Sequence, residues 1–352
     1  MLKEITLPEE LERIVDIGPV NASRQSIWML LAESGQIFRF DAETGDFAEA
    51  ARASVPPELD HEPWSDRVLK PRLHVSNRGD FVAVVNDYGR YGQIIDVQSN
   101  EVTLALDGGD YFSNTVPFSF AFADLNTKVV AIHRTAWNRL DFSDAASGKL
   151  LSERGPTSYR SGEQQPEHYL DYFHGALYVN PNSTRVVDDG WFWHPLGIPV
   201  AWSLERWFSD NVWESEDGST RVDLCVRESY WDKGMTWLDE RTVAVAGIGD
   251  DDLDMVEGAR IFDVTERGGQ KSRWGSTTDW AREIIAFPGP AGRFFSDGVS
   301  LYSSNSSGLS CWNPLDGTHT GHVGNFQPTH HHRGAGELAQ LHERTLRRWS
   351  TR

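Results

Sequence analysis

The chain has 352 residues, with 52 Asp and Glu against 33 Lys and Arg, so its formal net charge is −19. This charge disfavours nucleic acid as a partner, because phosphates attract clusters of Lys and Arg. A hydrophobic content of 39% can build a folded core, and no apolar run approaches the ~20 residues of a membrane span. The first residues lack a secretory signal, so we expect a cytoplasmic protein without membrane contact. Cys225 and Cys311 do not make a disulfide framework, and we expect both as small buried residues.

Short runs of β-branched and aromatic residues, bounded by Gly, Asn, Asp and Pro, recur along the chain and predict an all-β fold. Each repeat is an apolar strand, a polar turn and a second strand that ends near a turn signal. In chain order the strand pairs are 28–32 with 36–41, 81–85 with 93–97, 129–132 with 139–142, 185–187 with 199–204, 242–245 with 259–264, 299–302 with 309–312, and 338–341 with 345–349. In the fourth repeat we interpret Asp188-Asp189-Gly190 as the polar turn.

Seven repeats with a spacing of roughly 50 residues fall in the range of propeller blades. One such unit cannot bury both of its faces alone, whereas blades stacked radially cover one another. The sequence therefore predicts a single domain over residues 1–352, a seven-bladed β-propeller. The last repeat, about 326–352, lacks room for its outermost strand, and the alternating segment 2–7 is expected to supply it and close the ring. Aligning Pro71 to Phe81 with Pro328 to Leu338 places His74 opposite His331.

The second strands end in similar segments, FDAETG at 40–45 and FSDAASG at 142–148, and LYVNP follows at 177–181. With these features the chain resembles the WD40 and YVTN-like seven-bladed β-propeller superfamily over essentially its whole length, as a divergent, bacterial-type member. The Trp-Asp dipeptide is missing from the strand ends, so the side-chain network of WD40 blades is not expected. The resemblance implies a binding scaffold.

Repeat spacing is longest around the fourth repeat, which places extra residues near 153–171, 208–221 and 249–258. The stretch 51–71 is a further ordered connection. Long loops on a rigid scaffold are where binding surfaces concentrate. Many acidic residues fall in such loops, at 214–217 and 250–254, and we expect them to face a partner.

One candidate binding segment contains Trp191, Trp193 and His194. Several Trp beside a His and two Asp suit an aromatic recognition pocket, because Trp offers a large contact area at low entropic cost. The alternative is structural, since the period-two spacing of Trp191 and Trp193 places both on one face of a strand, where they can pack between blades.

A second candidate is the run His330, His331 and His332, to which the alignment adds His74. On a strand His330 and His332 share a face, and two imidazoles can begin a transition-metal site. No further ligand stands at a fixed spacing, so the favoured interpretation is a hydrated set of histidines that lines the channel without metal.

Asp250, Asp252 and Asp254 imitate the start of a calcium loop, but Met255 replaces the turn glycine, which favours a solvated acidic hairpin. No complete catalytic constellation is visible, and no cofactor or metal is expected. We therefore expect a non-catalytic, monomeric scaffold for a protein or peptide, with a basic partner favoured by the charge. The alternative is a propeller enzyme, a metal-dependent hydrolase or lyase. It would draw on four residues from different repeats: His74, His174, His331 and Asp189.

Overall fold

The computed structural model describes residues 2–58, 67–159, 162–251, 253–272 and 275–352. Across this part of the chain the strands form seven sheets, which confirms the predicted all-β, seven-bladed β-propeller. By compactness the chain divides into two units, one of residues 1–133, 143–149 and 325–352, the other of residues 134–142 and 150–324. Residues 59–66 of the predicted connection at 51–71, and Asp252 of the acidic run, lie outside the described residues.

The first unit contains three four-stranded sheets and part of a three-stranded one. One sheet has the order β1 (Leu2–Thr6), β29 (Thr345–Ser350), β28 (Glu337–His342) and β27 (His330–His332). The next is β2 (Ile14–Pro19), β3 (Ile27–Ala32), β4 (Gln36–Asp41) and β5 (Phe47–Arg52), followed by β6 (Lys70–Val75), β7 (Phe81–Asp87), β8 (Tyr91–Asp96) and β9 (Glu101–Asp107). A 3-10 turn, η1 (Ser113–Thr115), precedes the sheet of β10 (Phe120–Leu125), β11 (Lys128–Ala136) and β12 (Arg139–Asp144).

The second unit contains the remaining sheets and two short helices. Its first sheet has the order β17 (Val222–Asp223), β16 (Val200–Ser203), β14 (Arg185–Phe192), β15 (Leu196–Gly197) and β18 (Arg227–Glu228), with β13 (Phe173–Val179) also paired to β14. Helices α1 (Leu204–Ser209) and α2 (Glu214–Asp217) follow β16. The other two sheets are β19 (Met235–Trp237), β20 (Thr242–Ile248), β21 (Val256–Ser272) and β22 (Gly275–Pro288), then β23 (Arg293–Ser296), β24 (Leu301–Asn305), β25 (Gly308–Trp312) and β26 (His319–Gly324).

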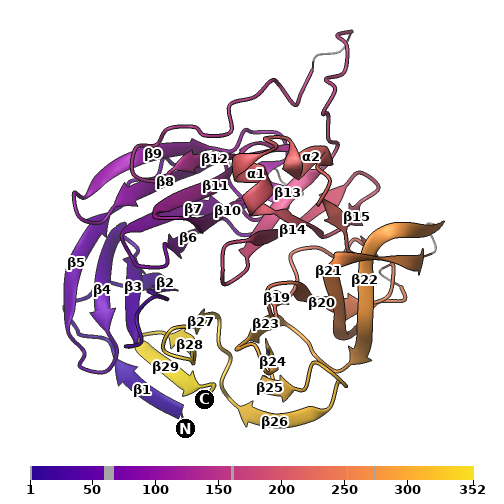
Figure 1. Cartoon of the computed structure of the whole chain (residues 1–352). Helices are drawn as coiled ribbons and strands as arrows, with labels where there is room; N and C mark the ends of the chain where they lie inside the picture. The colour runs from indigo at the N-terminus through magenta and orange to yellow at the C-terminus, as the bar shows by residue number, and fades with distance from the viewer. Residues whose placement is uncertain (1, 59–66, 160–161, 252, 273–274) are drawn as a thin grey trace. The chain divides into compact units, whose positions relative to one another are not determined.

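The N-terminal strand completes the C-terminal blade, as the sequence predicts. β1 runs antiparallel to β29, with Leu2 opposite Trp349 and Ile5 opposite Leu346 (Figure 1). Leu346 is fully buried in a core cluster, and Ile5 packs against it. The alternation of the first residues is therefore that of an edge strand with one face on the core.

The similar segments at the ends of the second strands are explained by one kind of turn. Asp41, Asp96, Asp144 and Asn313 each accept a hydrogen bond from the backbone N–H two residues later. The fourth residue after each has a positive φ; it is Asn100 in one copy and Gly in the others. A short polar side chain that folds back on its own backbone, followed by a left-handed residue, makes a tight hairpin, so these residue types repeat.

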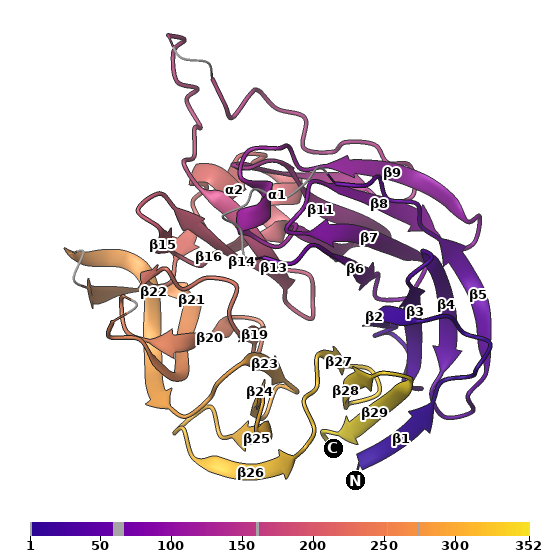
Figure 2. The ribbon, with the colours of Figure 1, turned by 180° about the vertical axis from the view of Figure 1, so that it is seen from behind.

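The first strands of neighbouring sheets lie side by side within each unit. In the first unit β27 contacts β2, β2 contacts β6, and β6 contacts β10 (Figures 1 and 2). In the second unit β13 contacts β19, and β19 contacts β23. Polar residues on these strands are thereby brought together although they are far apart in sequence.

Candidate functional site

Four aromatic rings of the second unit form what we call the aromatic stack: Trp137, Phe173, Trp191 and Trp231. The ring of Phe173 lies 4.2 Å from that of Trp191 with an interplanar angle of 6°, and Trp231 lies 5.1 Å from Trp191 on a nearly parallel plane. Trp137 lies 4.6 Å from Phe173. Trp191 is buried, and its indole Nε1 has no hydrogen-bond partner among the described residues. For Trp191 the geometry favours the packing alternative.

Trp193 lies at the edge of this stack and is 38% exposed. Its ring meets Trp191 at 5.3 Å and Phe173 at 5.2 Å, edge to face in both cases. It belongs to the turn between β14 and β15, which we call the Trp193 turn (residues 193–195). His194 in this turn is exposed and has a φ of 94°, a conformation that is rare for a residue with a side chain. Trp193 and His194 are thus exposed, and the ring of Trp193 packs against the buried ring of Trp191.

Asp188 and Asp189 are not in a turn, which corrects the sequence interpretation: both lie inside β14 and are fully buried. Asp188 Oδ2 lies 2.6 Å from His174 Nδ1, and its other oxygen accepts the N–H of Gly175. Asp189 Oδ1 lies 2.5 Å from the guanidinium of buried Arg227, which also donates to the carbonyl of Ala246. Two consecutive acids followed by glycine are typical of a turn, but here each carboxylate is hydrogen-bonded to a side chain from another strand.

Gly190 follows these acids at a place where Phe173 and Tyr172 approach the backbone too closely for a side chain. The Tyr172 hydroxyl donates to the carbonyl of Ile198 at 2.9 Å and accepts the N–H of Gly190 at 2.8 Å. A Cβ at Gly190 would stand 2.2 Å from the Phe173 carbonyl oxygen. Burial raises the pKa of Tyr172 well above its ordinary value. This core of β13 and β14 is a rigid support for the Trp193 turn.

Acidic segments border the Trp193 turn. The carbonyl of Pro195 accepts the N–H of Ser229, and Leu196 pairs with Glu228 across β15 and β18. The N–H of Glu228 in turn donates to the carbonyl of Asp250. The turn therefore adjoins the segment 228–232, which is hydrogen-bonded to Asp250.

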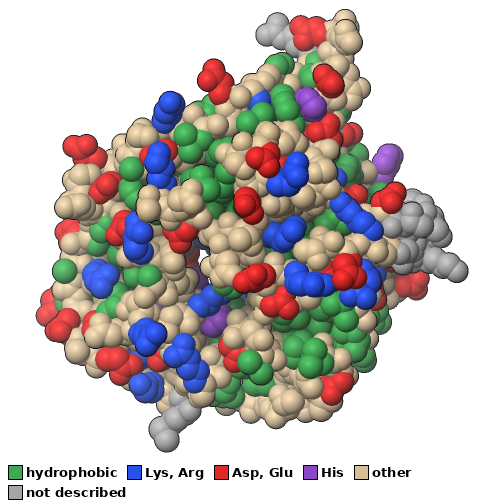
Figure 3. Space-filling model, in the orientation of Figure 1, with side chains coloured by type: hydrophobic (Ala, Val, Ile, Leu, Met, Phe, Trp, Pro, Cys, Tyr) green, Lys and Arg blue, Asp and Glu red, His purple; other side chains and the backbone are tan. Residues whose placement is uncertain are grey.

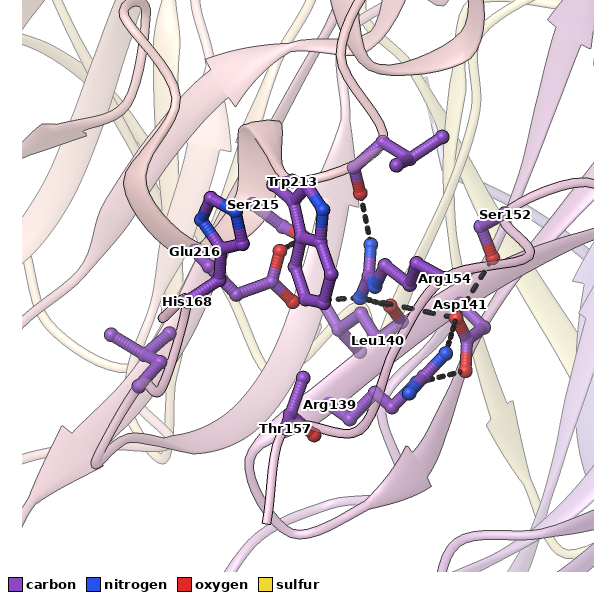
Figure 4. A network of polar contacts seen from close by, with 12 residues as sticks. Arg139, Leu140, Asp141, Ser152, Arg154, Thr157, His168, Trp213, Ser215 and Glu216 are labelled. Carbon is purple, nitrogen blue, oxygen red and sulfur yellow. Dashed lines mark hydrogen bonds and ion pairs between the residues drawn. The ribbon is translucent and has the colours of Figure 1, made fainter. Parts of the chain in front are cut away.

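The insertion after β12 is anchored by a buried ion pair (Figure 4). The Arg154 guanidinium lies 2.6 Å from Glu216 Oε1, and both side chains are 1% exposed. Arg154 also donates to the Leu140 carbonyl and lies over the ring of Trp213, whose ring stacks with His168 at 4.3 Å. Burial lowers the pKa of Arg154, although the negative charge of Glu216 opposes this shift.

A second anchor closes the base of the same insertion. The buried amide of Asn138 donates to the carbonyls of Thr157 and Leu170, both at 2.9 Å. Arg139 donates to the carbonyl of Gly155 at 2.8 Å and pairs with Asp141. The insertion predicted at 153–171 is therefore a loop whose two ends are held together.

Several loop acids that the sequence analysis expects at a partner surface are structural instead. Glu214 and Glu216 of α2 are buried, and Glu214 Oε1 accepts hydrogen bonds from the backbone N–H and the hydroxyl of Thr220. Asp251 is 2% exposed and accepts the N–H groups of Leu253 and Asp254. Composition cannot distinguish an acid that caps its own loop from one that faces solvent.

The predicted histidines gather only in part, on the first strands of the first unit. His330 Nε2 on β27 lies 3.3 Å from Asp16 Oδ1 on β2, and Asp16 also accepts the N–H of Leu73 on β6. Although burial opposes ionisation, the hydrogen bond from His330 and its charge lower the pKa of Asp16. His74 packs on Phe120 at 4.9 Å, and its Nε2 is buried without a hydrogen-bond partner in the described structure.

His332 has a structural role in this unit, and His331 does not align with His74. His332 is fully buried against Trp28, and its Nε2 lies 3.0 Å from the carbonyl oxygen of Ile27. In the strand pairing His74 is opposite Ala83, and His330 is opposite Ala339 at the matching place. The alignment of Pro71 to Phe81 with Pro328 to Leu338 is thus one residue out of register, because the two strand pairs have turns of different geometry.

Acidification is expected to destabilise the protein through His74. Burial, with the charge of Arg72, lowers the pKa of His74 from 6.5 to about 3. Unfolded chains take up this proton below pH 6.5 and the folded protein does not, so the free energy of unfolding falls as pH drops below 6.5. The loss is about 1.4 kcal/mol at pH 5.5. Urea denaturation at pH 7.5 and 5.5 measures it, and the His74→Gln variant should lose less; an unchanged pH dependence in that variant would contradict this assignment.

Within the described ranges no three His, Cys, Asp or Glu side chains come together in a way that could hold a metal ion. His174 and Asp189, two candidates of the enzyme hypothesis, are almost fully buried. Cys225 is buried as expected, with its thiol pKa raised by burial, whereas Cys311 is only partly buried. In the part of the chain that is described, no helix has the length and apolarity to cross a membrane.

Comparisons with known proteins agree on the fold. No family model matches the chain, and no curated protein does so either. Among solved structures, a chain of the crystal structure of the mitotic checkpoint complex is similar, with a TM-score of 0.56, 10% identity and coverage of 99% of this chain and 91% of that one. The structure of U3-55K is similar with a TM-score of 0.56, 10% identity and coverage of 98% and 97%. The likeness is one of fold, and it agrees with the seven-bladed β-propeller described above.

Proposed function

We propose that the protein is a non-catalytic scaffold that binds a protein or peptide partner in the cytoplasm. The observation that carries this proposal is the Trp193 turn, a surface-presented aromatic residue held on a rigid buried support. Exposed Trp with a fixed orientation is typical of interface hot spots, because little side-chain entropy is lost on binding. The fold supports the proposal in general terms, since one similar structure is named as a complex.

The distribution of charged side chains favours a local interaction surface over a uniformly acidic one. On the face drawn in Figure 3, Lys and Arg side chains stand among Asp and Glu side chains, so acids do not gather there into one patch. Many of the acids are also paired, as Asp189 with Arg227 and Glu216 with Arg154. A net charge of −19 still favours fast encounter with basic partners, with a rate that falls as salt rises.

A binding experiment with purified components tests the proposal. The immobilised full chain is exposed to extract of its native cells at low salt, retained proteins are identified, and each is purified and titrated against the chain. We expect at least one to bind saturably, with weaker binding at high salt. If none binds saturably when purified, the scaffold function is wrong. Thermal stabilisation by Ca²⁺, Mn²⁺ or Zn²⁺ would instead favour the metal-dependent alternative.

A further inference from the structure

We infer that two neighbouring turns of the second unit form a docking surface for a segment of a partner protein that is both basic and apolar. We call this surface the two-turn patch. It consists of the turn 297–300 and the turn 313–318, with Val299 and Leu315 at their tips. The inference rests on the proposed scaffold function, because it names a kind of partner, but it uses a surface other than the Trp193 turn.

Both turns lie at the same end of one sheet. The turn 297–300 joins β23 to β24, and the turn 313–318 joins β25 to β26. Leu301, the first residue of β24, is opposite Trp312, the last residue of β25. Neighbouring strands are about 4.8 Å apart, so the two tips are separated by two strand spacings, roughly 10 Å.

The apolar residues at these tips are strongly exposed. Val299 is 78% exposed, and Leu315 is 84% exposed. The half-buried residues Leu238 and Trp312 pack against the core cluster of this region, and Trp312 directly precedes the second turn. A Cβ placed on Gly298 would stand 3.7 Å from the carbonyl oxygen of Leu238, so the first turn lies against that residue. Each tip therefore adjoins a partly exposed member of the core, and the two are not scattered single residues.

The conformation of the second turn does not require a leucine. The N–H of Leu315 donates to Asn313 Oδ1, and the same hydrogen bond closes the corresponding turns of three other sheets. In those turns the residue at this position is Glu43, Gln98 or Ala146. The hydrogen bond uses the backbone N–H, so it accepts any of these side chains. The side chain of Leu315 therefore has no part in closing its turn.

The first turn also carries an apolar residue at a position that tolerates a polar one. The N–H of Val299 donates to Asp297 Oδ1, as the N–H of Arg241 donates to Asp239 Oδ1 in the corresponding turn of the neighbouring sheet. Valine thus stands where the equivalent turn has arginine. Two adjacent exposed apolar residues that their turns do not need are typical of an interaction surface.

Acidic side chains border the two-turn patch. Asp297 and Asp316 lie in its turns, and Asp239 directly follows the leucine that the first turn contacts. All three are exposed, and none of them forms an ion pair within the described ranges. Arg241, in the same turn as Asp239, pairs with two acids of β21 instead. The border therefore favours a positive partner and disfavours an acidic one.

These features together define the chemistry of the occupant. Covering Val299 and Leu315 removes apolar surface from water, which supplies affinity. Lys or Arg beside the apolar side chains meets the carboxylates of the border, which fixes orientation and makes association faster at low salt. Three residues of an extended chain span about 10 Å, so apolar side chains three positions apart match the separation of the tips.

Titration of the full chain with defined peptides tests the inference. The probe is an acetylated, amidated peptide of sequence Lys-Lys-Leu-Gly-Gly-Leu-Lys-Lys, and its binding is followed by ligand-observed NMR. One matched peptide has serine in place of leucine, and another has glutamate in place of lysine. We expect saturable binding of the probe and at least tenfold weaker binding of each matched peptide. Equal binding of the three peptides, or no binding of the probe, would overturn the inference.

Two double variants locate the binding surface. Val299→Asn with Leu315→Gln should weaken binding of the probe at least tenfold, because both apolar tips are lost. The control is Val256→Asn with Leu253→Gln, which removes another exposed Val and Leu, at the end of the neighbouring sheet where β20 joins β21. It should leave binding unchanged. If both double variants bind the probe equally well, the two-turn patch is not the site.

Neutral substitutions test the acidic border. Asp297→Asn with Asp316→Asn should weaken binding of the probe at low salt, and the difference should shrink at high salt because exposed charges are screened. Asparagine keeps an oxygen for the hydrogen bonds of the turn, as Asn313 shows. Asp41→Asn with Asp96→Asn makes the same change in corresponding turns of the first unit and should have little effect. Equal effects of the two pairs would contradict a local acidic border.

The two proposals fail in distinguishable ways. If a purified partner binds saturably and the Val299→Asn with Leu315→Gln variant binds it equally well, the scaffold function stands and this inference is wrong. If the probe binds through the two-turn patch but no purified protein binds, the patch is correct and the scaffold function is wrong. If the unchanged chain self-associates in sedimentation and this variant does not, a second copy covers the patch and a basic partner is wrong. Circular dichroism of each variant confirms that it is folded.

Discussion

Replacing Arg227 by Met is expected to lower the free energy of unfolding by about 3–5 kcal/mol. The Arg227 guanidinium and the Asp189 carboxylate are both fully buried, 2.5 Å apart. Burial raises the pKa of Asp189, and the charge of Arg227 opposes that rise. Met fills a similar volume but leaves an uncompensated acid inside β14, so the cost is that of a buried charge without a partner.

Urea denaturation, followed by tryptophan fluorescence, measures this effect. Arg241→Met is the control, because Arg241 pairs with Asp263 but is half-exposed, and its loss should cost at most about 1 kcal/mol. The double variant Arg227→Met with Asp189→Leu should recover much of the stability, since no buried charge remains. If Arg227→Met is no more destabilising than Arg241→Met, the pair of Arg227 and Asp189 contributes less to the free energy of unfolding than this prediction requires.

Replacing Trp191 by Ala is expected to destabilise the protein by about 3–5 kcal/mol, the range for removing a large aromatic residue from a core. Trp191 is buried between Phe173 and Trp231, so its removal leaves a cavity in the aromatic stack. Trp193→Ala removes two edge-to-face contacts and exposed surface, and should cost less, about 1–2 kcal/mol.

The two variants thus separate the structural role of Trp191 from the proposed binding role of Trp193. Denaturation of both variants under the same conditions gives the comparison, and titration with a purified partner gives the second readout. A Trp191→Ala variant as stable as the unchanged protein would mean that the stack does not hold the turn. A Trp193→Ala variant that unfolds would mean that this residue is part of the core.

The strand pairs could be predicted because each is a local pattern. Apolar residues of 28–32 and 36–41 form β3 and β4, and the same holds in each of the other repeats. The alternation at the N-terminus predicted β1, and its partner followed from the strand that the last repeat lacks. These features depend on neighbours in sequence or on the count of strands in a blade, and both are visible without coordinates.

The candidate site was only partly predictable. The segment with Trp191 and Trp193 was found, but period-two spacing could not tell which indole is buried, because that depends on Phe173 and Trp231 from other segments. The four histidines were named as a set, yet His332 belongs to the core and His330 pairs with Asp16, more than 300 residues away in sequence.

The class of fold, the number of blades and the strand that completes the last one can be predicted without the structure, because hydrophobic periodicity and turn chemistry are local properties. Which polar residues are structural depends on contacts between segments that are far apart in the chain. In the sequence, Asp188, Asp189 and Glu216 are typical of turns and loops. In the structure they are buried, and their partners are His174, Arg227 and Arg154, in that order, from other strands and loops. A buried charge needs a partner, and the packing of the chain, rather than the position in the sequence, determines which residue supplies it.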